Sequence, residues 1–225
     1  MNTNQNYGSH QDGGTVTTSN ASKVLRNTYS LLSATLLFSA LMAGLSSALN
    51  LPHPGIILTL GGYFGLLFLT TKFRNSSKGL LCVFALTGFM GYTLGPIINV
   101  YLKLPGGASI VSMAMGSTAL IFMALSGYAL TSKKNFSYLG NFLTVGIIVA
   151  FVAAIANIFL NIPALSITVS SVFVILMSGL ILYQTSEIIN GGETNYIMAT
   201  VTLFVSIFNL FTSLLHLLGI FNSNE

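Results

Sequence analysis

Seven long apolar runs separated by short polar turns constrain this chain more than any other feature. We expect an all-α polytopic membrane protein with seven transmembrane helices, because each run is long enough to cross ~30 Å of hydrocarbon at 1.5 Å per residue. Strands are excluded, since the runs lack the period-two alternation of membrane barrels and an open sheet would leave unpaired amides in lipid. The runs cover residues 28–49, 54–71, 79–101, 108–131, 138–161, 163–185 and 196–221.

Charge is too scarce for a soluble globule. Only 5% of the residues are charged and 53% are hydrophobic, whereas a soluble domain carries about 25% charged residues. The basic residues stand in pairs and triplets between the runs, and this scattering does not indicate a nucleic-acid surface. The single cysteine, Cys82, excludes an internal disulfide and a thiolate metal cluster, and we expect it to pack as a small apolar side chain.

The chain divides into a polar tail and a helical domain. Residues 1–22 are rich in Asn, Gln, Thr, Ser and Gly, so they bury too little apolar surface to offset the entropy of ordering. We predict a disordered tail over 1–22 and a seven-helix domain over 23–225. The first apolar run is about 22 residues long, longer than the ~7–15 of a signal peptide, so it should stay in the membrane.

The distribution of basic residues predicts the orientation. Lys103 lies alone on one side of the predicted membrane. The positive-inside rule therefore puts the N-terminus in the cytoplasm, and seven crossings put the C-terminus outside, which is the periplasm in a bacterial cell. The other seven basic residues share the opposite side: Lys23, Arg26, Lys72, Arg74, Lys78, Lys133 and Lys134.

The linker SEIINGGETNY, residues 186–196, holds two of the four acidic residues and no Lys or Arg. Gly191 and Gly192 permit a tight turn with positive φ. Glu193 lies near the start of the last run, where the helix dipole favours an anion, and Thr194 or Asn195 is expected to cap that helix. We interpret the linker as building the cytoplasmic start of the last helix, with contact to a partner as the alternative.

A polar stripe follows one face of the last run. Thr202, Ser206, Asn209, Ser213 and His216 are four, three, four and three residues apart, which places them on one side of a helix. Facing lipid would leave their polar groups unsatisfied, so the stripe should turn inward. It predicts either an interhelical hydrogen-bond seam or a conduction or sensing pathway. Asn209 and His216 are the candidate functional residues, since imidazole titrates near neutral pH.

Small residues indicate helix contacts. Gly61 and Gly65, and likewise Gly91 and Gly95, form G-x-x-x-G pairs that let backbones approach closely. Pro96 should bend the third helix. None of the twelve Lys, Arg, Asp and Glu residues falls inside a predicted span, unlike in ion-coupled transporters. No H-E-x-x-H, G-x-S-x-G or P-loop motif is present, so we predict no enzyme, metal or cofactor.

Four segments of the chain resemble the Bax inhibitor-1 family. YQTSEIINGGETNYIMATVTLFVSIFNLF at 183–211 is similar to the family's C-terminal signature. The resemblance extends from residue 23 to residue 219, and its other segments are KVLRNTYSLLSATLLFSA at 23–40, LPHPGIILTLGG at 51–62 and GYTLGPIIN at 91–99.

The resemblance implies a fold and a partner. The fold has six helices wrapped around a central, rather polar seventh. Bacterial members of the family lie in the inner membrane, where they are substrates and modulators of FtsH, an ATP-dependent membrane protease. The implied function is therefore binding and modulation of an FtsH-type protease complex in membrane-protein quality control. An unfolded cytoplasmic tail suits such an enzyme, and seven packed helices would resist extraction from the lipid bilayer.

The family also implies an alternative function. Some members are associated with a proton-sensitive calcium leak, in which two aspartates share a proton and gate a pore. Those aspartates would fall at Gln184 and Ser206, which do not ionise, so this chain lacks the acidic pair. Glu187, one helical turn beyond Gln184, is a possible displaced acid. We expect Glu187 to form a salt bridge with Lys72 or Arg74 on the same side of the membrane.

Overall fold

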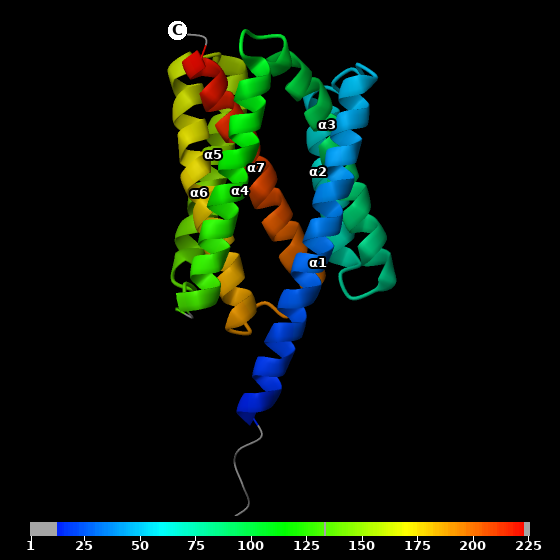
Figure 1. The fold of residues 1–225 in the computed structure, drawn as a ribbon, viewed down its shortest axis with the longest axis vertical. Coiled ribbons are helices and arrows are strands. Elements are labelled where there is room, and N and C mark those ends of the chain that lie inside the picture. The colour runs from blue at the N-terminus through cyan, green and yellow to red at the C-terminus, as the bar shows by residue number, and fades with distance from the viewer. Residues whose placement is uncertain (1–12, 133, 223–225) are drawn as a thin grey trace, which may run out of the picture.

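The computed structural model describes residues 13–132 and 134–222, which form seven helices and no strand (Figure 1). The predicted all-α fold is confirmed, and most helix ends lie within two residues of the predicted runs. The helices are α1 (Gly13–Ala48), α2 (Ile56–Lys72), α3 (Ser77–Leu102), α4 (Gly107–Ser132), α5 (Leu139–Leu160), α6 (Pro163–Ile189) and α7 (Tyr196–Asn222).

Two helices are longer than their apolar runs. Helix α1 begins at Gly13, inside the segment 1–22 that we expected to be a tail, and α6 continues past residue 185 to Ile189. An established helix gains one hydrogen bond for each residue added, so it propagates readily into polar sequence. The last turn of α6 is also anchored by Ile188, which is fully buried. Residues 1–12 lie outside the described residues, and the tail remains a prediction for them.

Six of the helices are long and apolar enough to span a bilayer, and α2 is shorter, at 17 residues. At 1.5 Å per residue α2 is about 26 Å long, slightly less than the ~30 Å hydrocarbon core. It nevertheless runs between the two ends of the bundle, and α1 begins at the end opposite to the one where α7 finishes (Figure 1). The chain therefore runs from one end of the bundle to the other an odd number of times, as the sequence predicts.

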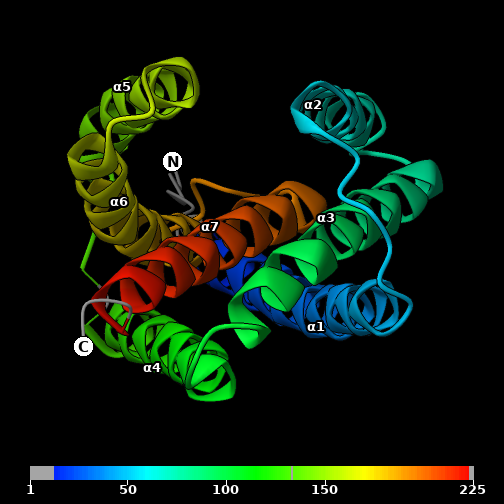
Figure 2. The same cartoon turned by 90° about the horizontal axis from the view of Figure 1, so that it is seen from above.

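Helix α7 occupies the centre of the bundle, between a group formed by α1, α2 and α3 and a group formed by α4, α5 and α6 (Figure 2). It packs directly against α1, α3, α4 and α6. Leu203, Leu210 and Leu215 of α7 are fully buried. The central seventh helix is confirmed. The ring around it is uneven, however, because α2 packs mainly on α3, α5 packs on α6, and neither makes extensive contact with α7.

The outer surface of the bundle is apolar. Large hydrophobic side chains on the peripheral helices are solvent-accessible in the isolated chain, for example Ile57 of α2 at 89% and Phe159 of α5 at 80%. A water-soluble monomer rarely exposes apolar patches of such extent. These faces are therefore the ones that contact lipid.

The glycine pair Gly91 and Gly95 lies where α3 meets α1. A Cβ atom at Gly91 would collide with the backbone carbonyl oxygen of Ser39, and one at Gly95 would lie 2.6 Å from the Cβ of Ser46. The close helix approach predicted for this pair is therefore confirmed. Without a hydrophobic force between helices in lipid, close packing of this kind is a main source of association.

Pro96 contributes to the same contact. Proline has no N–H, so the carbonyl of Tyr92 four residues earlier has no donor within its own helix. The Ser46 hydroxyl on α1 donates to that carbonyl oxygen at 2.9 Å. Helix α3 is assigned as one continuous helix through Pro96, and the freed carbonyl becomes a link between two helices.

The other pair, Gly61 and Gly65, makes no helix contact, so this prediction was wrong. Both residues are exposed, and a Cβ atom at either would meet nothing within 4 Å. The same spacing therefore has different consequences on α2 and α3, because only the α3 pair faces a neighbouring backbone.

We predict that Gly91→Ala destabilises the folded protein by about 1–3 kcal/mol, since the added methyl overpacks a contact made with rigid backbone. Gly61→Ala is the matched control. It should stabilise by up to about 1 kcal/mol, because alanine favours a helix over glycine and has free space there. Thermal unfolding in a mild detergent measures both. Equal melting temperatures for the two variants would contradict the α1–α3 contact.

Candidate functional site

The turn between α6 and α7 closes the end of α6 and redirects the chain. Gly191 has a φ of 76°, so the predicted glycine turn with positive φ is confirmed. The backbone N–H groups of Gly192 and Glu193 both donate to the carbonyl oxygen of Glu187, at 2.8 and 3.1 Å. These bonds satisfy a carbonyl at the end of α6 that has no donor within the helix.

Asn195 caps α7. Its side-chain oxygen accepts the backbone N–H groups of Ile197 and Met198 at 3.0 and 3.1 Å, as expected of an N-cap residue. The Glu193 carboxylate accepts the N–H of Asn195 at 2.7 Å. Of the two predicted candidates the cap is therefore Asn195, while Thr194 is exposed.

The same Asn195 side chain ties α7 to another turn. Its amide nitrogen donates to the carbonyl oxygen of Arg74 at 3.1 Å and to the side-chain oxygen of Asn75 at 2.8 Å. Both residues lie in the turn between α2 and α3. One amide thus starts the central helix and fixes it to a turn 120 residues earlier in the chain.

Glu187 is not paired with a basic residue in the part of the chain that the structure describes. Its carboxylate accepts a hydrogen bond from the Ser137 hydroxyl at 2.6 Å, and no salt bridge is found within residues 13–132 and 134–222. The predicted salt bridge to Lys72 or Arg74 was therefore wrong. The last turn of α6 instead faces the segment between α4 and α5. There the Ser186 hydroxyl accepts the backbone N–H of Phe136 and donates to the carbonyl oxygen of Lys134.

The positions where the family resemblance puts two aspartates are both enclosed by the bundle. Gln184 on α6 is 5% exposed and Ser206 on α7 is fully buried. The Ser206 hydroxyl donates to the carbonyl oxygen of Thr202 in its own helix at 2.7 Å. The amide nitrogen of Gln184 is buried without a hydrogen-bond partner in the described part of the chain.

A group of hydroxyl contacts at Thr185, the residue after Gln184, was not predicted from the sequence. The Thr185 hydroxyl lies 3.3 Å from the Tyr29 hydroxyl of α1 and 3.4 Å from the Ser126 hydroxyl of α4. These three side chains link α1, α4 and α6. They lie in three separate runs, so only a search for buried hydroxyl groups across several runs would have indicated them.

The stripe on α7 turns inward, but its residues do not form a continuous seam. His216 lies between two hydroxyl groups of α6, with Nδ1 2.8 Å from Ser170 and Nε2 3.3 Å from Ser166. The amide nitrogen of Asn209 instead donates to the carbonyl oxygen of Val205 in its own helix at 2.8 Å. The predicted interhelical bonding is therefore confirmed at His216 and is not seen at Asn209.

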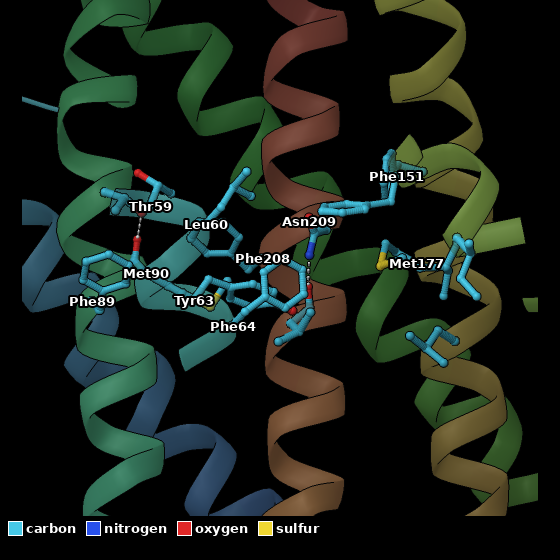
Figure 3. Close-up of a pocket in the computed structure, with 16 residues that line it drawn as sticks. Thr59, Leu60, Tyr63, Phe64, Phe89, Met90, Phe151, Met177, Phe208 and Asn209 are labelled. Carbon is cyan, nitrogen blue, oxygen red and sulfur yellow. Dashed lines mark hydrogen bonds between the residues drawn. The ribbon is translucent and has the colours of Figure 1, made fainter. Parts of the chain in front are cut away.

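Asn209 lies against an apolar cavity of about 410 Å³. This cavity, here called the apolar chamber, is bounded by α2 and α3 on one side and by α5 and α6 on the other (Figure 3). Phe64 of α2 and Phe151 of α5 line it, and their rings meet edge to face with centroids 5.7 Å apart. Phe208 of α7 also lines the chamber.

A second cavity of about 640 Å³, here called the polar chamber, lies between α5, α6 and α7. Asn157, Ser170, Ser213 and His216 contribute polar groups to its lining. Asn209 lines both chambers. The inner face of α7 therefore borders the polar chamber along its last turns and the apolar chamber near Asn209, at the middle of the helix.

Comparison with known proteins identifies close relatives. Residues 21–223 match the sequence model of a family described as inhibitor of apoptosis-promoting Bax1. A protein of Escherichia coli K12 named modulator of FtsH protease YccA is 55% identical over 197 residues, which cover 88% of this chain and 90% of that protein.

Two further relatives are also named as membrane proteins. The inner membrane protein YccA of E. coli O6:H1 is 55% identical, again over 88% of this chain and 90% of its own length. A membrane protein of Vibrio cholerae described as uncharacterised is 45% identical over 90% of this chain and 92% of its own. The similarity therefore covers almost the whole helical bundle.

We predict that Asn195→Ala lowers the free energy of unfolding by about 1 kcal/mol or more, because it removes a helix cap and also the link to the turn between α2 and α3. Thr194→Ala is the control. It should change stability by less than about 0.5 kcal/mol, as is usual for an exposed side chain. Hydrogen exchange at the first turn of α7 should accelerate in the Asn195 variant alone, and equal exchange in both would rule out the cap.

Proposed function

Since this chain belongs to the Bax inhibitor-1 family, we propose that it binds an FtsH-type membrane protease and modulates its activity in membrane-protein quality control. The observation that carries the proposal is the 55% identity to the E. coli modulator of FtsH protease over 88% of the chain. An all-helical bundle with six long apolar helices is suited to act within the membrane beside such an enzyme.

In this proposal the N-terminal side of α1 faces the cytoplasm. Lys23 and Arg26 lie in the first part of α1, and Arg74 lies in the turn between α2 and α3, at the same end of the bundle (Figure 1). Lys103 follows α3 at the opposite end. The positive-inside rule then assigns the end with the basic residues to the cytoplasm and the end of α7 to the periplasm.

The start of α1 supplies a handle for the protease. Helix α1 runs beyond the other helices at this end (Figure 1), and its packing against the core begins at Val24 and Leu25. In this proposal an enzyme engages the polar segment before Val24 first, ahead of the residues that pack on the core. The packed helices then resist extraction, and the protein occupies the protease rather than being degraded at once.

The same end of the bundle offers a surface for contact with the protease. A groove of about 440 Å³ lies between α1 and the turn that precedes α7, and Lys23, Asn27, Glu193 and Tyr196 line it. Neither Glu193 nor Glu187 forms an ion pair with a base in the described residues, and each carboxylate accepts one hydrogen bond. In this proposal the two glutamates contact the partner.

Co-purification tests the binding. Membranes containing this protein and the FtsH-type protease of the same organism are dissolved in mild detergent, and the protein is captured through a C-terminal tag. We expect the protease to co-purify, and overproduction of the protein to slow degradation of another membrane substrate. Failure of both would reject the proposed function.

We predict that deleting residues 2–19 lengthens the protein's half-life several-fold in cells with the protease, because the enzyme loses its handle while the packed part of α1 remains. A variant with an unrelated Gly/Ser/Thr sequence of equal length in place of 2–19 is the control. It should restore turnover, since the handle acts through length and accessibility. Unchanged turnover after deletion would exclude the tail's role.

The alternative function, a calcium leak, is tested by measuring calcium release from vesicles. We predict that vesicles containing the protein release calcium no faster than empty vesicles on acidification, because neither Gln184 nor Ser206 ionises. A fluorescent calcium indicator measures the release, and the double variant Gln184→Asp, Ser206→Asp serves as the comparison. Flux from the unsubstituted protein that rises with acidity would support a leak function instead.

A further inference from the structure

We propose that the apolar and polar chambers, joined at Asn209, form one binding site for a membrane glycerolipid with an uncharged or zwitterionic head group. One acyl chain fills the apolar chamber, and the ester and head-group region occupies the polar chamber. This inference does not depend on the proposed interaction with a protease.

The apolar chamber lies at the middle depth of the membrane. Asn209 is the central residue of α7, which covers residues 196–222, and it lines the chamber. The surrounding solvent at this depth is hydrocarbon. Apolar walls facing an empty space lose dispersion contacts, so a flexible hydrocarbon chain is the ligand whose chemistry matches Phe64, Phe151 and Phe208 (Figure 3).

The size of the apolar chamber favours an acyl chain over a transmembrane helix of another protein. A helix about 10 Å wide with a pitch of 5.4 Å occupies roughly 420 Å³ per turn. The chamber volume of about 410 Å³ therefore holds about one turn, whereas a spanning helix needs about 20 residues. The Phe64–Phe151 contact between α2 and α5 would also have to break before a helix could enter.

The polar chamber provides hydrogen-bonding groups but no charge. Among the described residues its lining holds no Asp, Glu, Lys or Arg, so no basic side chain balances the net negative charge of an anionic head group, for which basic pockets are usual. Asn157 uses its side-chain oxygen to accept the N–H of Ile162 at 3.1 Å. Its amide N–H₂ and the Ser213 hydroxyl, which also lines the chamber, are suited to the ester and head-group oxygens of a lipid.

The connection between the chambers distinguishes this site from an ordinary lipid-facing groove. Asn209 and Phe151 line both chambers, so the chambers are adjacent and in this proposal one molecule extends from one into the other. A third cavity of about 320 Å³ lies on the other side of α7, between α1, α3 and α4, and Met115 and Phe204 line it. Among the described residues that cavity shares none with the polar chamber and Phe208 alone with the apolar chamber. Its other residues serve as an internal reference for non-specific acyl contact.

Photo-crosslinking tests the site. The full-length protein is placed in nanodiscs containing phosphatidylethanolamine with a diazirine in the middle of one acyl chain, and the labelled peptides are mapped after irradiation. We expect labelling at Phe151 and Phe173, which line the two chambers and not the third cavity, to exceed labelling at Met115 and Phe204. Equal labelling of the two cavities would overturn the proposal.

Two matched variants test whether the apolar chamber holds the chain. Ile148 and Val152 lie one turn apart on α5 and are 58% and 59% exposed, but only Ile148 lines the chamber. Ile148→Trp should lower labelling at Phe173 about tenfold, equivalent to about 1.4 kcal/mol, while Val152→Trp should leave it unchanged. Thr59→Trp fills the chamber from α2 and should act as Ile148→Trp does.

To show that each variant is folded, its melting temperature must match that of Val152→Trp. If Ile148→Trp fails this requirement, Thr59→Trp decides the result. Retained labelling in the folded variants would overturn the proposal.

Competition with unlabelled molecules identifies the occupant. Phosphatidylethanolamine should displace the probe about tenfold more effectively than phosphatidylglycerol, a difference of about 1.4 kcal/mol. Equal or stronger competition by the anionic lipid would overturn the head-group assignment. Displacement by an apolar transmembrane peptide, with no effect of either lipid, would identify a helix of a partner protein as the ligand instead.

Discussion

The hydrocarbon core contains no water to bond a free amide, and every other feature of this protein depends on that constraint. Each backbone N–H and carbonyl within the membrane must find its partner inside the chain, so the apolar runs become helices and the turns lie at their ends. Where Pro96 breaks this internal pairing, the freed carbonyl of Tyr92 takes the Ser46 hydroxyl of a neighbouring helix. The exception therefore obeys the same requirement and adds a contact between α1 and α3.

Lipid is as apolar as the helices, so packing geometry rather than hydrophobicity decides which helices associate. Gly91 and Gly95 allow α3 to reach the backbone and side chains of α1. Polar side chains hold the central helix at both ends, with Asn195 fixing its start to the turn between α2 and α3 and His216 meeting two hydroxyl groups of α6. Helices α2 and α5 have fewer such contacts and remain peripheral.

The uneven attachment of the peripheral helices also explains where the apolar and polar chambers lie. Because neither α2 nor α5 packs extensively on α7, the inner face of α7 is left bordering the apolar and polar chambers on that side. The surface proposed for the protease is a separate region, at the end of the bundle where α1 projects. Substitutions in the proposed lipid site and substitutions in the proposed protease surface should therefore act independently of each other.

The sequence by itself determined the seven helices, the inward face of α7 and the positive φ at Gly191, because these follow from local periodicity, chain length and the nature of the solvent. It did not distinguish Gly61 from Gly91, since their spacing is the same and only the position of a neighbouring helix separates them. The partner of Glu187 proved to be Ser137 rather than Lys72 or Arg74. The two chambers likewise exist only because five helices distant in sequence meet around Asn209, and no local pattern encodes that meeting.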